Sequence, residues 1–322
     1  MNILFLHRKR AGDIGGLSRF VAELVSRFPR TVYTKPIDLV HATDATLLPV
    51  AAVVATALGT PYTVTIHGLD LVWPNVLYQL SIKFFLPKAR HIIVDSKETL
   101  PLLSAHHVDR KRISFIAPGI SINQLRKATP FPLPDLRGKY VLITVSNVVP
   151  RKGHAWFMTE VLWRLGKNYH YLVVGDGPQK KLLTDLAHQL GLISRVTFLN
   201  TVTHGQLTYL LTQVAHIMVF PNRHMPGNWE GFGIAAGEGA AMGLPVLASR
   251  VDGLPSVIHH GRNGILLGSR PEVWIQTIQQ LQKTGTQNRI GRKAKTYTSS
   301  HFSWDTTVTA YRKIFQEVIR RT

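Results

Sequence analysis

The chain contains no cysteine. This absence excludes a disulfide-stapled fold, a zinc site built on thiolates and a thiol nucleophile, and it is consistent with a reducing compartment. Hydrophobic residues make up 45% of the 322 residues, so the chain can bury a core without cross-links. That composition excludes wholesale disorder, and the length suits one large or two medium domains.

Acidic side chains are scarce. Asp and Glu together number 18 against 38 Lys and Arg, which gives a formal net charge of +20. The excess is spread over both halves of the chain and is not gathered in a tail. Such a field attracts polyanions, and charge alone leaves nucleic acid, anionic lipid and phosphorylated substrates as candidate partners.

Long hydrophobic runs are also missing. The longest, Leu47 to Gly59, contains Pro49 and is shorter than the roughly 20 residues of a membrane-spanning helix. The short apolar stretch Ile3–Leu6 precedes a basic cluster, which is the wrong order for a signal peptide. We therefore expect a cytoplasmic protein, whose membrane contact, if any, is peripheral and on the cytoplasmic face.

Strand-like and helix-like segments alternate along the first part of the chain. Buried strands are expected at 2–7, 39–41, 62–67, 91–95 and 113–117, with helices at 17–27, 45–58, 75–86 and 96–105. The segment Thr129–Pro134 then holds three prolines. Because proline lacks a donor and fixes φ, this segment is typical of a linker.

The alternation resumes after the prolines. Strands are expected at 140–146, 169–174, 195–199, 216–220 and 245–248, with helices at 155–165, 179–190 and 304–321. Alternating elements imply parallel sheets with helices on both faces. We predict an α/β protein with two doubly wound, Rossmann-like domains, one over 1–134 and one over 138–303, facing a cleft. Ligands of such sheets bind beyond the carboxyl ends of the strands, so functional residues are expected in the strand-to-helix turns.

The most informative stretch runs from Glu230 to Pro245 and reads EGFGIAAGEGAAMGLP. Glu230 and Glu238 bracket a glycine-rich turn. If the following helix begins near Gly233, Glu238 lies about two turns inside it. Free backbone N–H groups at a helix N-terminus favour phosphate or oxyanion binding. The alternative is a tight strand–helix turn with two solvated acids.

This stretch resembles the Glu-x7-Glu motif of the retaining nucleotide-sugar glycosyltransferases of family 4, which have the GT-B fold. Other segments match the same family in the same order and together cover nearly the whole chain. They are Gly15-Gly16, Thr65–Asp70, Pro118–Ile120, Val149–Gly153, Val174–Pro178, Val196–Leu199, Pro245–Ala248, Gly253–Pro255 and Asn263–Leu266. Each glycine turn alone is weak evidence, but the ordered series is specific. The resemblance also implies that the helix in 304–322 crosses back to the N-terminal domain.

The resemblance assigns roles to the residues of this run. Glu230 would lie beside the transferred sugar, and Glu238 would bind the ribose, whose adjacent hydroxyls can both donate to one carboxylate. The backbone amides expected to face the sugar and the phosphates are those of Gly231, Phe232, Gly233 and Ile234.

A basic turn follows the first strand of the second half. Lys152 would neutralise the diphosphate as it gains charge on leaving. The family commonly has an arginine five residues earlier, where this chain has Asn147, so one expected phosphate ligand is missing. Arg151 is a candidate replacement, although neighbouring residues of an extended chain point in different directions. The alternative for both cations is a solvated basic turn.

Other strand ends carry further candidates. The resemblance places His67 in the active site, where it could hydrogen-bond the sugar or acceptor, whereas a lone histidine is more often structural. Gly15 and Gly16 would lie near the donor phosphates and acceptor, unless they only start a helix. Gly177 would approach the nucleotide, unless it belongs to an ordinary Asp-Gly turn. Val202 would lie near the base.

Neither a metal nor a cofactor is expected. The adjacent pairs His106-His107 and His259-His260 lack the spacing of a metal site, since neighbours on a helix do not face one point. Cations and backbone amides would serve the diphosphate instead, and the nucleoside-diphosphate sugar would be a substrate.

The N-terminal domain, which is expected to bind the acceptor, contains fewer motifs that indicate what it binds. The stretch Trp73 to Arg90 mixes aromatic residues with cations, which suits an interfacial helix on anionic lipid. The alternative is a core-facing helix with a solvated basic edge. Because one diphosphate site cannot account for a net charge of +20, we expect docking to an anionic membrane surface.

The leading hypothesis is an enzyme that moves a hexose-type sugar, with retention, from a nucleoside-diphosphate sugar to a glycan or lipid-linked acceptor, as in cell-envelope polysaccharide biosynthesis. No residue is an obvious covalent nucleophile, so front-face attack is expected, with the diphosphate taking the acceptor proton. The alternative is a polyanion-binding protein on an inactive transferase scaffold. Specific nucleic-acid binding is not expected, since no known module is evident. A sugar epimerase of the same fold fits the Glu-x7-Glu run less well.

Overall fold

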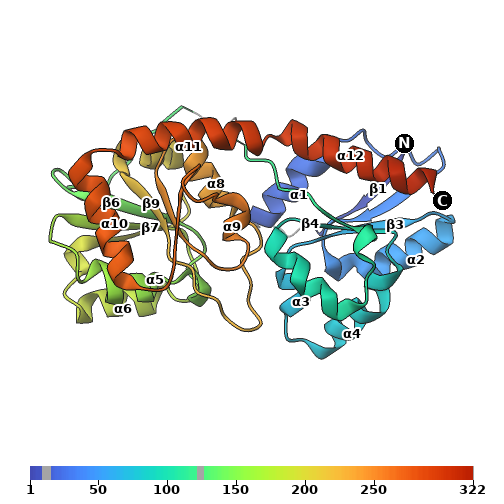
Figure 1. Ribbon diagram of the computed structural model, residues 1–322, viewed down its shortest axis with the longest axis horizontal. Coiled ribbons are helices and arrows are strands. Elements are labelled where there is room, and N and C mark those ends of the chain that lie inside the picture. The colour runs from blue at the N-terminus through green and yellow to red at the C-terminus, as the bar shows by residue number, and fades with distance from the viewer. Residues whose placement is uncertain (9–15, 122–126, 322) are drawn as a thin grey trace. The chain divides into compact units, whose positions relative to one another are not determined.

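The computed structural model describes residues 1–8, 16–121 and 127–321. The chain folds into two compact α/β units (Figure 1). Unit 1 comprises Met1–Gly119, Met225–Gly233 and Phe302–Thr322, and unit 2 comprises Ile120–His224 and Ile234–His301. Each unit therefore draws on segments that are far apart in the sequence.

Unit 1 is built on a parallel sheet that has five strands within the described residues, in the order β1-β2-β3-β4-β5. Its strands, all short and mainly apolar, are β1 (Ile3–Leu6), β2 (Leu39–Ala42), β3 (Tyr62–Ile66), β4 (His91–Val94) and β5 (Ile113–Phe115). Its helices are α1 (Gly16–Ser26), η1 (Ala45–Leu47), α2 (Leu48–Leu58), α3 (Leu69–Val72), α4 (Val76–Phe85), η2 (Leu86–Lys88), η3 (Lys97–His106), η4 (Arg110–Arg112) and α12 (Trp304–Arg320).

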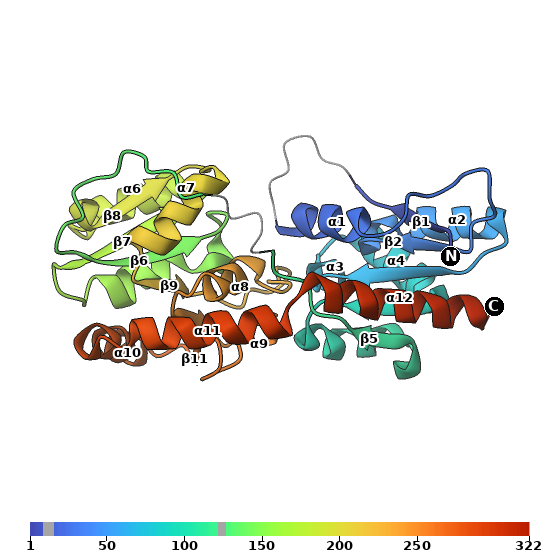
Figure 2. The ribbon, with the colours of Figure 1, turned by 90° about the horizontal axis from the view of Figure 1, so that it is seen from above.

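Helices cover both faces of this sheet (Figures 1 and 2). On one face, α12 places Phe315 against Phe5 and His41, with ring centroids 6.1 and 5.0 Å apart, and α1 contributes Phe20 against Trp304. On the other face, α2 and α4 pack onto the alternate strand residues in one buried apolar cluster. The C-terminal helix thus belongs to the same unit as the N-terminal strands, as the resemblance implied.

Unit 2 is built on a second parallel sheet, with six strands in its described residues and the order β11-β10-β9-β6-β7-β8. The strands are β6 (Tyr140–Val145), β7 (Tyr169–Val174), β8 (Val196–Leu199), β9 (Ile217–Phe220), β10 (Val246–Ser249) and β11 (Ile265–Leu267). The helices are η5 (Pro150–Lys152), α5 (His154–Trp156), η6 (Phe157–Leu162), α6 (Lys180–Gln189), η7 (Ile193–Arg195), α7 (His204–Tyr209), η8 (Leu210–Val214), α8 (Ile234–Ala241), α9 (Leu254–Val257), α10 (Pro271–Thr284) and α11 (Gln287–His301).

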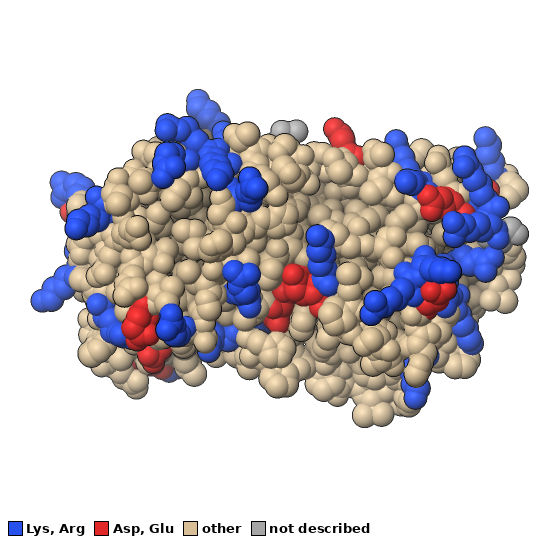
Figure 3. All heavy atoms as spheres, viewed as in Figure 1, with Lys and Arg blue, Asp and Glu red and all other residues tan. Residues whose placement is uncertain are grey.

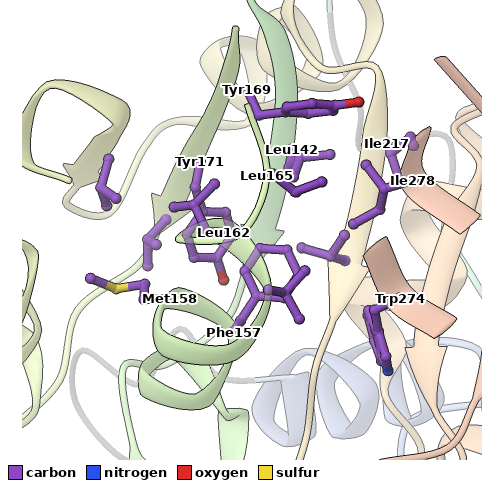
Figure 4. Packing of buried hydrophobic residues seen from close by; sticks show 14 of the residues in the cluster. Leu142, Phe157, Met158, Leu162, Leu165, Tyr169, Tyr171, Ile217, Trp274 and Ile278 are labelled. Carbon is purple, nitrogen blue, oxygen red and sulfur yellow. The ribbon is translucent and has the colours of Figure 1, made fainter. Parts of the chain in front are cut away.

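The core of unit 2 lies between this sheet and the helices on one of its faces. Figure 4 shows Leu142 and Tyr171 from the strands meeting Phe157 from η6 and Trp274 from α10. All four side chains are buried, and aliphatic residues complete the cluster around the aromatic rings. The central strands β6, β7, β9 and β10 are buried along nearly their whole length, and their sequences are mainly apolar.

The strands predicted from the sequence are confirmed to within one or two residues at each end, but several helices differ. The segment expected as a helix at 96–105 is the 3₁₀ segment η3, because Pro101 within it has no N–H to donate. The helix expected at 155–165 changes from α5 to the π-helical turn η6. The helices α10 and α11 were not expected. The buried stripe of α11 is made of Gly291, Ala294 and Thr298, which give no apolar signal.

The proline-rich segment is part of unit 2 and packs on its surface. The Thr129 N–H donates to the Gly205 carbonyl at 3.0 Å, and the Phe131 ring lies 6.4 Å from that of Tyr209. The division between the units falls earlier, after Gly119. The prolines thus fix an extended segment against α7 instead of separating two domains there.

Within the described ranges no helix is both long and apolar enough to cross a bilayer. Lys and Arg side chains are distributed over the face of the molecule drawn in Figure 3, with Asp and Glu far fewer. The structure therefore spreads the surplus charge widely, as the sequence does.

Candidate active site

Three polar residues of unit 1 directly follow neighbouring strands. Thr43 follows β2, His67 follows β3 and Asp95 follows β4. Because parallel strands end at the same edge, these residues meet there. His67 donates from Nδ1 to Asp95 Oδ2 at 2.7 Å and from Nε2 to the Thr43 carbonyl at 2.8 Å. Sequence reasoning identified His67 but missed both of its partners.

The surroundings of His67 hold its ring in the charged form. Burial is the largest single influence on the pKa of His67 and lowers it. The negative charges of Asp95 and Asp70 and the hydrogen bonds to Asp95 and the Thr43 backbone raise the pKa, and together they outweigh burial. They raise the pKa of His67 from 6.5 to about 9. Since both ring nitrogens face acceptors, the ring is an imidazolium that donates twice. His67 is therefore a fixed positive charge at neutral pH.

A second buried histidine shows the opposite behaviour. His41 lies on β2, with Nδ1 2.8 Å from Thr63 Oγ1 and Nε2 3.2 Å from Thr65 Oγ1. Burial, assisted by the nearby charge of His67, lowers its pKa to about 3. The unit thus holds one neutral and one charged histidine, and only the charged one follows a strand end.

The loop after β3 is fixed by Asp70. Its Oδ2 accepts from the backbone N–H of His67 at 3.0 Å and of Ala45 at 3.4 Å. Burial raises the pKa of Asp70, while the charge of His67 acts in the opposite direction. Gly68 has φ +73°, and a Cβ there would overlap the Trp229 ring. Only glycine fits this turn.

Two buried oxygens beside His67 have no hydrogen-bond partner among the described residues. They are Thr43 Oγ1 and Asp95 Oδ1. Buried polar atoms are nearly always paired, so unpaired ones are characteristic of functional sites. Both atoms belong to residues at the carboxyl edge of the sheet, where a polar ligand could complete their hydrogen bonding.

The first half of the glycine-rich run belongs to this same edge. Residues 225–233 fall within unit 1, and Glu230 is buried there. A Cβ on Gly231 would lie 3.0 Å from the His67 carbonyl and 3.4 Å from Asp95 Oδ2, so this backbone runs against both residues. Phe232 packs on Phe302 with ring centroids 5.8 Å apart. The structure thus brings Gly231, next to Glu230, against His67.

Unit 2 carries the basic turn after β6. Lys152 ends η5 and is buried. Gly153 follows with φ +70°, and a Cβ there would overlap the Pro221 carbonyl, so the turn is tightly packed on the residues after β9. Arg223, which sequence reasoning missed, donates its backbone N–H to the Arg151 carbonyl at 2.8 Å. Its guanidinium lies 4.8 Å from the Trp156 ring centroid.

The charge of Lys152 also affects a neighbouring histidine. His154 has Nδ1 2.9 Å from the Tyr171 hydroxyl and Nε2 3.2 Å from Ser146 Oγ. Burial and then the charge of Lys152 lower its pKa to about 4. His154 is therefore neutral, and the positive charge of this turn resides on lysine and arginine.

One predicted glycine of unit 2, Gly177, is required by packing. A Cβ on Gly177 would overlap the Val148 carbonyl, and the Gly177 N–H is bonded to Asp176 Oδ1 at 2.8 Å. The turn after β7 thus presses on the turn after β6. Val202 is half-buried and directly precedes the Thr203–Gln206 capping box of α7.

The second half of the glycine-rich run belongs to unit 2. Gly233 has φ +79°, and α8 begins at Ile234. Glu238 is buried just over one turn into α8, so the expectation of two turns was wrong. A Cβ on Gly237 would approach Ile120 Cδ1 to 2.7 Å, so this glycine serves helix packing.

Gly15 lies outside the described residues, and Gly16 is the first residue of α1. In the described part of the chain no group of three or more His, Asp and Glu side chains is arranged to hold a metal ion.

Comparison with known proteins identifies the family. Residues 126–297 match the family model of glycosyl transferases group 1, and residues 6–119 match that of the glycosyl transferase 4-like domain. The first match alone covers more than half of the chain. The chain therefore belongs to the group 1 glycosyltransferase family.

Individual relatives are more distant. The chain is 25% identical over 263 residues to a GDP-mannose-dependent alpha-(1-6)-phosphatidylinositol monomannoside mannosyltransferase of Mycobacterium tuberculosis, covering 74% of this chain and 65% of that protein. It is 30% identical over 235 residues to a D-inositol 3-phosphate glycosyltransferase of Mycolicibacterium gilvum, covering 69% and 51%. The chain thus spans about half to two thirds of the length of these curated relatives.

Solved structures share the fold. Anabaena Alr3699/HepE in complex with UDP matches with a TM-score of 0.81 at 18% identity, covering 98% of this chain and all of that one (100%). Sucrose-phosphate synthase from Thermosynechococcus elongatus matches with a TM-score of 0.74 at 20% identity, covering 95% and 78%. The fold is GT-B, as the resemblance implied.

Proposed function

We propose that this protein is a retaining glycosyltransferase that moves a hexose-type sugar from a nucleoside-diphosphate sugar to a glycan or lipid-linked acceptor at the cytoplasmic membrane face. The observation that carries the proposal is the strand edge of unit 1. There His67, charged at neutral pH, and its partner Asp95 lie against the backbone of Gly231, next to Glu230. Buried unpaired oxygens of Thr43 and Asp95 lie at the same strand edge, in a chain of a glycosyltransferase family.

Unit 1 is proposed to serve the sugar and the acceptor. Hydroxyl groups of a sugar both donate and accept, which suits the unpaired oxygens of Thr43 and Asp95. A carboxylate at Glu230 can accept from sugar hydroxyls or stabilise the positive charge that develops at the anomeric carbon. His67, which donates both protons to protein groups, supplies positive charge and rigidity and does not act as a general base in this state.

Unit 2 is proposed to hold the nucleoside diphosphate. Lys152 and Arg151 lie in the turn after β6, and Arg223 is hydrogen-bonded to that turn. These cations offset the missing arginine at Asn147 and stabilise the charge that accumulates on the diphosphate as the glycosidic bond breaks. Glu238 is proposed to accept from the two ribose hydroxyls, and the backbone around Val202 to face the base. The diphosphate charge needs no metal in this scheme.

Attack from the leaving-group face completes the proposed reaction. The acceptor hydroxyl forms the new bond to the anomeric carbon on the side from which the diphosphate departs. Its proton passes to a diphosphate oxygen, so no protein base or covalent nucleophile is required. The configuration is retained because bond formation and cleavage occur on one face.

Relatives supply two donor candidates. The name of the Mycobacterium tuberculosis relative specifies GDP-mannose and phosphatidylinositol monomannoside, whereas the Anabaena structure holds UDP. The test is calorimetric titration of the chain with UDP, GDP and ADP, followed by turnover assays with the matching sugars. Tight binding of one nucleotide that persists at high salt supports the transferase.

The same experiment addresses the alternative of a polyanion-binding protein on an inactive scaffold. Its specific support is Asn147, where the family commonly has a phosphate-binding arginine. Failure to bind any nucleotide, together with salt-sensitive binding of heparin, would favour that alternative. Loss of nucleotide binding in Lys152→Ala but not in Lys167→Ala, an exposed lysine elsewhere in unit 2, would favour the enzyme.

A further inference from the structure

The outer face of α4 is apolar, unlike that of an ordinary surface helix. Val76, Leu77, Leu80 and Phe84 are 73, 79, 57 and 58% exposed, and Trp73 just before the helix is 48% exposed. Val76, Leu77, Leu80 and Phe84 are spaced by one, three and four residues, which places them on one stripe of the helix, while Trp73 precedes the helix in extended backbone. The opposite side of the helix carries the buried Ile82, which packs into the core of unit 1.

Such an arrangement makes α4 apolar on two sides. A surface helix of a globular protein normally turns polar residues to water, and large exposed apolar patches mark interaction sites. The helix α2 packs beside α4 and extends the patch with Val50 and Val53, which are 49 and 67% exposed. No charged residue occurs within α2.

The sequence around the patch is unusual for so basic a chain. Residues 36–82 contain no Lys or Arg at all, although the whole chain carries 38. Cations then appear at the far end of α4. Lys83 is exposed, and Lys88 Nζ lies 3.3 Å from the centroid of the Phe84 ring. Figure 3 shows the surface over α3 and α4, at the lower right, as largely free of charged side chains, with Lys and Arg gathered next to it.

We propose that this face, formed by Trp73, by Val76, Leu77, Leu80 and Phe84 of α4 and by Val50 and Val53 of α2, inserts into the interfacial region of an anionic membrane. We call it the α4 face. Its apolar side chains would enter the boundary between headgroups and acyl chains, and Lys83 and Lys88 would contact anionic headgroups. This inference deepens the membrane contact of the proposed function by naming the surface and the mode of binding.

Charge complementarity selects a membrane over a second copy of the chain. In a two-fold dimer the same patch meets itself, so Lys83 and Lys88 of both copies would be brought together. Two chains of net charge +20 also repel each other, and the α4 face contains no acidic residue to offset this. A bilayer supplies apolar depth and anionic headgroups in the geometry that the α4 face presents.

Vesicle flotation tests the proposal, without nucleotide or acceptor. Vesicles of phosphatidylglycerol and phosphatidylcholine are compared with pure phosphatidylcholine, using the whole chain. The variant is Leu77→Gln/Leu80→Gln. The matched control is Leu182→Gln/Ile193→Gln in unit 2, whose side chains are also exposed, at 53 and 44%. Leu77→Ala/Leu80→Ala retains helix propensity and serves as a second variant, and thermal unfolding verifies that all variants fold.

We expect the wild type and the unit 2 control to bind anionic vesicles equally, and both α4 variants to bind about tenfold more weakly or worse. High salt should weaken wild-type binding without abolishing it, because the apolar contribution is not screened. Equal binding by the wild type and the α4 variants would overturn the proposal. So would wild-type binding that vanishes at high salt, or a dimer in solution that Leu77→Gln/Leu80→Gln dissociates.

These outcomes are separate from those of the proposed function. A chain that binds vesicles but no nucleotide refutes the transferase and leaves the α4 face intact. A chain that transfers sugar but binds no vesicles refutes the α4 face and the proposed membrane contact, and leaves the transferase intact.

Discussion

His67 Nδ1 donates to Asp95 Oδ2 across 2.7 Å, and this contact joins the ends of two neighbouring strands. The two residues are 28 positions apart in the sequence, and the register that pairs Ile66 with Val94 sets them side by side. The pair is buried, so its charge is little screened by solvent.

The first prediction concerns pH and stability. The folded-state pKa of His67, about 9, lies above its ordinary value of 6.5. Its contribution to stability is therefore complete below pH 6.5 and is lost as pH rises through 9, with an upper limit of about 3 kcal/mol. Asp95→Asn should remove this dependence. The free energy of unfolding, measured in urea at pH 6, 7.5 and 9, shows this pH dependence. The control is Asp135→Asn, which removes an exposed ion pair with Arg137 and should leave the pH dependence of unfolding unchanged.

The second prediction concerns Glu230. Glu230→Ala should lower kcat by at least about a hundredfold, because a carboxylate beside the reacting carbon acts mainly in the transition state. Nucleoside diphosphate affinity should change little, since the proposed nucleotide contacts lie in unit 2. Calorimetry and initial rates measure the two effects. Glu272→Ala, which removes an exposed partner of Arg164, should leave both unchanged. Full activity in Glu230→Ala would contradict the site.

The third prediction concerns Lys152. Lys152→Ala should reduce both nucleoside diphosphate affinity and kcat, each by tenfold or more, because the cation meets charge in the ground state and more charge in the transition state. Lys167→Ala should match the wild type. If Lys152→Ala binds and turns over normally while remaining folded, the basic turn is not the diphosphate site.

The fourth prediction concerns the packing of the two turns in unit 2. Gly177→Ala should cost about 1–3 kcal/mol of stability, because the new methyl group overlaps the Val148 carbonyl and backbone cannot easily yield. Gly268→Ala is the matched control, since no atom lies within 4 Å of a Cβ there. Denaturant unfolding compares the two, and equal stabilities would contradict the packing explanation.

The sequence predicted the strands and the two α/β units because short apolar runs separated by glycine turns are a local signal. Through an ordered set of motifs it also proposed His67, Lys152 and the two glutamates as site residues, and their roles stay a prediction. It missed Asp95, although an acid directly after an apolar run at 91–94 was a usable signal, because its meaning depends on a partner 28 residues away. Arg223 was missed for the same reason, since its backbone contact with Arg151 spans 72 positions, 223 minus 151.

The glycine-rich run shows why motif reading alone is incomplete. From the sequence, the backbone of Gly231 to Ile234 was expected to face the sugar and the phosphates. In the structure, Gly237 lies close to Ile120, and Gly231 runs against His67 and Asp95. The run also passes from one unit to the other at Gly233, so Glu230 and Glu238 belong to different units. Packing needs and unit boundaries arise from tertiary structure and leave no mark in the local pattern.

The place of α12 has a consequence for synthesis on the ribosome. Strands β1 to β5 of unit 1 are translated before unit 2, yet the face of their sheet that holds His41 and Thr65 is closed by Phe315 and Tyr311. Those residues are translated after the whole of unit 2. The first-made unit therefore reaches its native packing only after unit 2 has been synthesised, and a nascent chain that stops before α12 exposes a half-covered sheet to chaperones.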